Sequence, residues 1–140
     1  MDVGGQAVGL QVWDTAGQER FLSLGAAFYK GSDCCILVFD VTEPESFNHI
    51  ADWKKEFLER NAAKDDNFPF VVIGNKIDKE SSRKVSAEKA KMWCKTNGNL
   101  LYFETSAKDG TSVTDAFKEV ANIAFKNRKS SVYYPHFNSI

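Results

Sequence analysis

The sequence predicts an α/β fold in which helices wrap a mostly parallel sheet. Three observations predict it: four short apolar runs typical of strands, a helix-period apolar stripe after each run, and capping residues before the helices. In folds of this class, ligands bind beyond the carboxyl ends of the strands. Candidate functional residues are therefore expected directly after each predicted strand.

The apolar runs predict strands over residues 8–13, 35–41, 70–74 and 100–104. The middle two runs are rich in β-branched residues and nearly continuous in apolarity, which predicts strands covered on both faces.

Four stripes of helical period follow the runs and predict helix faces that lie in the core. Their members are Phe21, Leu24 and Phe28; Phe47, Ile50, Trp53, Phe57 and Leu58; Ala90, Trp93 and Cys94; and Val113, Ala116, Phe117, Val120 and Ala124. Thr42, Ser86 and Ser112 are predicted to cap free backbone N–H groups at helix starts.

The composition excludes several classes of function. The length of 140 residues predicts one domain, and 18 basic against 19 acidic residues leave no basic stripe for nucleic acid. No apolar run approaches the roughly 20 residues of a bilayer span, so a soluble intracellular protein is expected. Cys34, Cys35 and Cys94 have no metal-ligand spacing and are interpreted as reduced packing residues.

Polar turns follow three of the strands. The first contains Asp14, Thr15, Ala16, Gly17 and Gln18. An aspartate there can organise the waters around Mg²⁺, a glycine can expose its N–H group to a terminal phosphate, and a glutamine can orient an attacking water. Taken alone, the turn is a weak signal, because turns of this kind are common at strand exits.

The turns after the third and fourth strands favour a purine base. Asn75, Lys76 and Asp78 follow the third strand, and an aspartate can accept two hydrogen bonds from guanine, whereas adenine presents an acceptor there. The fourth strand leads into Thr105-Ser106-Ala107-Lys108, whose small side chains are predicted to leave backbone N–H groups free for a base carbonyl. Each turn alone is a common polar loop, but their order on successive parallel strands favours one nucleotide site.

These turns resemble the Ras superfamily of GTPases. Residues 13–21 are similar to the Rab form of the second switch, and residues 28–35, 67–72 and 102–108 resemble the late-endosomal and vacuolar Rab subtype. The resemblance implies a P-loop NTPase-type three-layer fold over residues 1–127, followed by a variable tail over 128–140. It implies GTP or GDP with Mg²⁺ as cofactor. The implied site residues are Asp14 (through water to Mg²⁺), Thr15, Ala16, Gly17, Gln18 (catalytic), Asn75, Lys76, Asp78, Ser106, Ala107 and Lys108.

The sequence also departs from the family pattern. It contains no Gly-x-x-x-x-Gly-Lys-Ser or Gly-x-x-x-x-Gly-Lys-Thr loop, so the family's first strand, first helix, first switch and most of its second strand are expected to be missing. The absent strand normally lies mid-sheet, and its loss would leave backbone groups unpaired. The chain ends Phe137-Asn138-Ser139-Ile140, without the prenylated cysteines of Rab proteins, so no lipid anchor is expected.

Three functional hypotheses follow. One is a Rab-type GTPase acting in traffic at the cytosolic face of late endosome, lysosome or vacuole, with nucleotide binding and hydrolysis impaired by the missing loop. Another is a nucleotide-independent module that binds Rab effectors or regulators through the second-switch helix, residues 19–30. The third is an incomplete gene model of an active GTPase.

Overall fold

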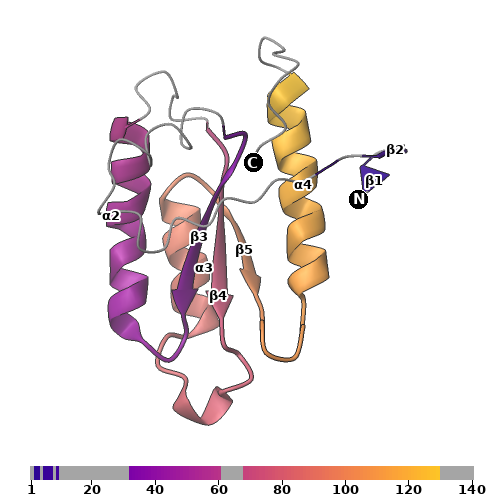
Figure 1. Ribbon diagram of the computed structural model, residues 1–140. Coiled ribbons are helices and arrows are strands. Elements are labelled where there is room, and N and C mark those ends of the chain that lie inside the picture. Colours follow the sequence, from indigo (N-terminus) through magenta and orange to yellow (C-terminus); the bar gives the residue numbers. More distant parts are fainter. Residues whose placement is uncertain (1, 4, 8, 10–31, 61–67, 130–140) are drawn as a thin grey trace. The chain divides into compact units, whose positions relative to one another are not determined.

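The computed structural model describes most of the chain from Ser32 onward (Figure 1). The described residues are 2–3, 5–7, 9, 32–60 and 68–129. Among the predicted strands and helices, the first strand apart from Gly9 and the helical stripe of Phe21, Leu24 and Phe28 fall outside them.

The chain forms two compact units. The first comprises Met1–Cys35, Glu56–Pro69 and Lys118–Ile140, and the second comprises Ile36–Lys55 and Phe70–Phe117.

Strands and helices alternate along the described chain, which confirms the predicted α/β class. The elements are β1 (Asp2–Val3), β2 (Gln6–Ala7), β3 (Cys35–Asp40), α2 (Pro44–Arg60), β4 (Phe70–Asn75), the 3₁₀ helix η2 (Glu80–Ser82), α3 (Ala87–Thr96), β5 (Leu101–Glu104) and α4 (Val113–Lys129). The last three predicted strands are therefore placed correctly to within one residue. No helix in the described residues has both the length and the apolarity that a bilayer span requires.

The larger sheet has the order β3-β4-β5. β4 and β5 are parallel, with Val71 opposite Leu101 and Gly74 opposite Glu104. All three arrows point the same way in Figure 1, so the carboxyl ends of the three strands lie at one edge. This arrangement brings the turns after β4 and β5 side by side, as expected for a ligand site in a parallel sheet.

The prediction of strands covered on both faces is correct for β4 and wrong for β3. Residues 70–74 of β4 are all buried. On β3, Leu37 and Phe39 are buried whereas Val38 is 47% exposed. The alternation is that of a strand with one covered face, on which Phe39 packs edge-on against Phe47 with ring centroids 5.0 Å apart.

The α2 stripe is correct except at Trp53. Phe47, Ile50 and Phe57 are buried, but Trp53 is 41% exposed. At about 100° per residue, Trp53 falls at the margin of the buried stripe, and Lys54 lies nearer its centre with its ammonium 5.3 Å from the centroid of the Phe70 ring. Trp53 instead meets His49 one turn earlier, at a centroid distance of 5.9 Å.

The three predicted helix caps have different outcomes. Ser86 is confirmed, because its hydroxyl accepts the Lys89 N–H at 3.1 Å at the start of α3. Thr42 is wrong: α2 begins at Pro44, and the Thr42 hydroxyl donates to Asp40 at 2.7 Å. Ser112 directly precedes α4, but its φ of 58° departs from the extended conformation typical of a capping residue.

The cysteines are free thiols, as predicted. Cys34 and Cys94 are buried. Burial raises the pKa of Cys34 to about 12 and that of Cys94 to about 11, and it also raises the pKa of Cys35. Such thiols stay protonated at neutral pH and therefore serve as packing residues.

A short hairpin in the first unit was not predicted. β1 and β2 pair antiparallel, with Asp2 opposite Ala7 and Val3 opposite Gln6. Gly5 in the turn has a φ of 84°, which a glycine adopts without a steric penalty. The Gly-Gly pair at positions 4 and 5 is a recognised hairpin signal that could have indicated this turn.

Candidate functional site

The turn that leaves β4 begins with Asn75 and continues through Lys76, Ile77 and Asp78 into η2. Lys76 has a φ of 68°, a conformation that is uncommon for a residue with a side chain. The turn closes through a hydrogen bond from the Lys79 N–H to the Lys76 carbonyl at 3.0 Å. Strained backbone of this kind concentrates at functional sites.

The turn that leaves β5 begins with two buried residues, Thr105 and Ser106. The Thr105 N–H continues the sheet by donating to the Gly74 carbonyl at 2.9 Å. Ser106 donates its own N–H to Thr111 and accepts the Gly110 N–H on its carbonyl at 2.8 Å. Ala107 and Lys108 follow and are exposed. The turn is therefore buried where it leaves β5 and accessible to a ligand at its tip.

Side chains connect the two turns at three points. The Ser106 hydroxyl donates to the Asp78 carboxylate at 2.8 Å. The Asn75 Oδ1 atom accepts from the Thr105 hydroxyl and from the Ala107 N–H, each at 3.1 Å. The structure thus brings together Asn75, Asp78, Ser106 and Ala107, which the sequence analysis assigned to one site.

The Ala107 N–H was expected to be free for a base carbonyl, but it donates to Asn75 within the protein. Because both neighbours of Asn75 Oδ1 are donors, the amide oxygen faces the β5 turn and the Nδ2 group is directed away from it. The donor that this turn offers a ligand on the Asn75 side is therefore the asparagine amide.

Asp78 is exposed and keeps capacity to accept further hydrogen bonds. A carboxylate offers about four acceptor positions, and the bond from Ser106 uses one of them. Since Ser106 itself is fully buried, the bond holds the exposed carboxylate of Asp78 against a buried part of the protein. This acceptor suits a ligand that presents two adjacent N–H groups.

Lys76 has a partner that the sequence analysis missed. Its ammonium lies 2.8 Å from the carboxylate of Asp40, the last residue of β3. Thr42 donates to the same carboxylate through its N–H at 2.8 Å. Partial burial alone would raise the pKa of Asp40, but the hydrogen bonds from Lys76 and Thr42 hold it below its usual value. The position of Asp40 at a strand end was the available signal.

A second missed cluster joins the segment after η2 to the end of β5. The Arg83 guanidinium binds both carboxylate oxygens of Glu104, and the Tyr102 hydroxyl donates to Glu104 at 2.6 Å. Hydrogen bonding to Arg83 holds the pKa of Glu104 below its usual value. We call these three residues the Arg83 clamp.

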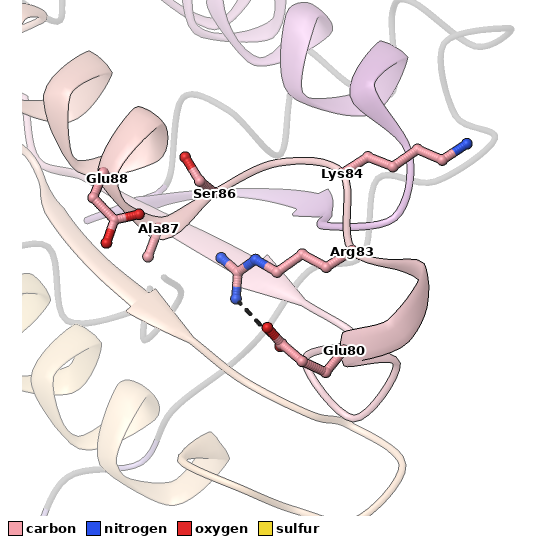
Figure 2. A pocket seen from close by; sticks show the side chains of 6 residues that line it. All are labelled: Glu80, Arg83, Lys84, Ser86, Ala87 and Glu88. Atoms are coloured by element: carbon pink, nitrogen blue, oxygen red, sulfur yellow. Dashed lines mark ion pairs between the residues drawn. The ribbon is translucent and has the colours of Figure 1, made fainter.

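Figure 2 shows a surface pocket beside the clamp. It is lined by Glu80, Arg83, Lys84, Ser86, Ala87 and Glu88. Arg83 also pairs there with the exposed Glu80 at 3.9 Å. The lining thus carries side chains of both charge signs.

Acid is expected to destabilise the fold through Glu104. Its folded pKa lies below the unfolded value of 4.5, so the group contributes stability above about pH 4.5 that is lost as the pH falls through the lower folded pKa. Glu104→Gln cannot titrate and should lose less stability between about pH 7 and about pH 3.5 than the wild type. Urea unfolding at both pH values measures this, and identical losses in the two proteins would contradict the assignment.

The predicted phosphate and metal residues, Asp14 to Gln18, lie outside the described residues. Within the described ranges, no group of three or more His, Cys, Asp or Glu side chains has the arrangement of a metal site.

Comparison with known proteins identifies the family. The model of the Ras family matches residues 1–126, so the chain belongs to the Ras family. Within that family it is similar to Rab7 proteins. It is 52% identical over 130 residues to Ras-related protein Rab-7a of Paramecium octaurelia, covering 91% of this chain and 63% of the relative. It is 55% identical over 128 residues to Ras-related protein Rab7 of Cenchrus ciliaris, covering 89% of this chain and 62% of the relative.

The chain thus spans less than two thirds of the length of these relatives.

Proposed function

We propose that this chain is a Rab-type small GTPase that recognises guanine through the turns at residues 75–78 and 105–108. The observation that carries the proposal is the bond from buried Ser106 to exposed Asp78, which holds a carboxylate at the shared edge of two parallel strands. Guanine presents N1–H and the 2-amino group side by side, and one carboxylate accepts from both.

The neighbouring residues take complementary parts in the proposed contact. The Asn75 amide donates to an acceptor on the imidazole side of the base. The methylenes of Lys76 lie along the base plane while Asp40 holds the ammonium. The Lys108 N–H would donate to the base carbonyl, and Ala107, whose own N–H is bonded to Asn75, would leave room for the base. Adenine would place its N1 acceptor against Asp78 and has no 2-amino group, so the carboxylate would lose both hydrogen bonds, which costs affinity.

The phosphate end of the site is proposed from family resemblance. Asp14 would act through water on Mg²⁺, Thr15, Ala16 and Gly17 would lie at the terminal phosphate, and Gln18 would orient the hydrolytic water. The bound Mg²⁺ would neutralise phosphate charge. We propose the GTPase domain over residues 1–127, with residues 128–140 as a tail.

We propose the cellular role from the same resemblance. The chain would act in vesicle traffic at the cytosolic face of the late endosome, lysosome or vacuole. The second-switch helix, residues 19–30, would bind the effectors and regulators. The similarity to Rab7 proteins supports this role.

Titration with fluorescent GDP and fluorescent ADP, in excess Mg²⁺, tests the recognition of guanine. Two charge-assisted bonds to Asp78 are worth about 3 kcal/mol together, so the full chain should bind GDP at least about a hundredfold more tightly than ADP. Circular dichroism establishes that the protein is folded. Equal affinity for the two nucleotides, or no binding of either by the folded chain, overturns the proposal and leaves nucleotide-independent partner binding to be tested.

A further inference from the structure

The Arg83 guanidinium is held at both of its ends. Its Nη1 group donates to Glu104 Oε1 at 2.9 Å and its Nη2 group contacts Glu104 Oε2. Its Nε group donates to the Val85 carbonyl at 2.7 Å. Only 14% of the Arg83 side chain is exposed, and 24% of that of Glu104. A two-pronged contact of this kind fixes orientation as well as distance.

Tyr102 extends the clamp to β4. Its hydroxyl donates to Glu104 Oε2, and its ring stacks on Phe39 at a centroid distance of 6.2 Å. The same hydroxyl would lie 2.5 Å from a Cβ atom added at Gly74. Tyr102 therefore packs directly against the residue that precedes Asn75.

The clamp contacts both proposed base-binding turns where they leave the sheet. Glu104 immediately precedes the 105–108 turn, Gly74 immediately precedes the 75–78 turn, and Arg83 follows Asp78 across η2. The turns are also joined directly, by the bond from Ser106 to Asp78 at 2.8 Å and by a longer one, 3.3 Å, from the Ile77 N–H to the Thr105 carbonyl. The clamp joins the same two turns at the residues where they leave the sheet, and it does so through an ion pair with two contacts.

We propose that Arg83 is a positioning residue for guanine recognition. Arg83 binds Glu104, and Tyr102 binds the same carboxylate. These contacts set the distance between the two turns, so that Asp78 and the 105–108 turn can bind the same guanine base. This inference rests on the proposed function. A purely structural clamp would stabilise the whole sheet equally and would not discriminate between bases.

Three variants of the full chain separate these roles. Arg83→Gln removes both the charge and the two-pronged contact with Glu104. Arg83→Lys keeps the charge without the two-pronged contact, and Tyr102→Phe removes a single hydrogen bond. Glu80→Gln is the matched control, because it removes the exposed partner of the same arginine.

Amide hydrogen exchange is the first readout, and it needs no nucleotide. In Arg83→Gln, exchange at the Ile77 and Ala107 N–H groups, which bond between the turns, should accelerate at least about tenfold relative to amides within β4. Arg83→Lys should resemble Arg83→Gln, and Glu80→Gln should match the wild type. Acceleration that is equal in the turns and in β4, or none in the turns, overturns the positioning role. If Arg83→Gln fails to fold, the milder Tyr102→Phe gives the same comparison.

The second readout is the preference for GDP over inosine diphosphate, which lacks the 2-amino group that Asp78 would accept. Arg83→Gln should reduce this preference by about tenfold, whereas a loss of affinity that is equal for both ligands overturns the inference. A folded wild type that binds no GDP refutes the proposed function, and with it this inference. A wild type that binds GDP while Arg83→Gln leaves the preference unchanged refutes this inference alone.

Discussion

Replacing Asp78 with asparagine is expected to convert the proposed guanine site into one that prefers xanthine. Xanthine carries a carbonyl where guanine carries the 2-amino group, and it keeps the neighbouring N1–H. An asparagine amide can accept from N1–H and donate to that carbonyl, whereas the aspartate carboxylate only accepts. GDP affinity should fall by about a hundredfold and xanthosine diphosphate should become the tighter ligand.

The Ser106 contact makes this substitution structurally mild. A hydroxyl both donates and accepts, so Ser106 can bond either end of the new amide in place of the carboxylate that it now binds at 2.8 Å. Competition titrations with GDP and xanthosine diphosphate measure the change. Asp52→Asn is the matched control, because Asp52 is an exposed carboxylate on α2 and should leave both affinities unchanged. Loss of binding to both ligands by a folded Asp78→Asn protein would contradict the assignment of Asp78.

The sequence predicted those parts of the fold that depend on local pattern. The unbroken apolar run of β4 and the Ser86 cap of α3 were both correct, because each follows from residues within a few positions of one another. The helix cap predicted at Thr42 was wrong, also for a local reason. The Asp40 carboxylate lies two residues earlier and accepts a hydrogen bond from the threonine hydroxyl before the helix begins. The exposure of Val38 depends on what covers β3, which its own residues do not specify.

The sequence indicated residues of the candidate site, but not the residues that hold them in place. Asn75, Asp78, Ser106 and Ala107 were identified because their residue types suit a purine and their order matches successive strand ends. Asp40 and the Arg83 clamp were missed because their partners lie far away in the sequence. Arg83 and Glu104 are 21 positions apart, and no spacing rule connects an arginine in a loop with a glutamate on a strand.

The other large effect is expected at Gly74, where an added methyl group has no space. A Cβ atom there would lie 2.5 Å from the Tyr102 hydroxyl, 2.9 Å from Cζ of Phe39 and 3.2 Å from Cγ1 of Val41. Tyr102 cannot withdraw easily because it is bonded to Glu104, and the Phe39 ring is packed against both Phe47 and Tyr102. Gly74→Ala should therefore lower the free energy of unfolding by about 3 kcal/mol, at the upper end of the usual cost of overpacking.

Urea unfolding followed by circular dichroism measures this loss. Gly9→Ala is the matched control, because a Cβ atom at Gly9 meets nothing within 4 Å. Tyr102→Phe removes the atom nearest the new methyl group, so the double variant should lose less stability than the sum of the two single losses. Strict additivity would instead place the clash on Phe39 and Val41. Because Gly74 directly precedes Asn75, a displaced β4 should also weaken guanine binding, which would link the packing of the sheet to the geometry of the proposed site.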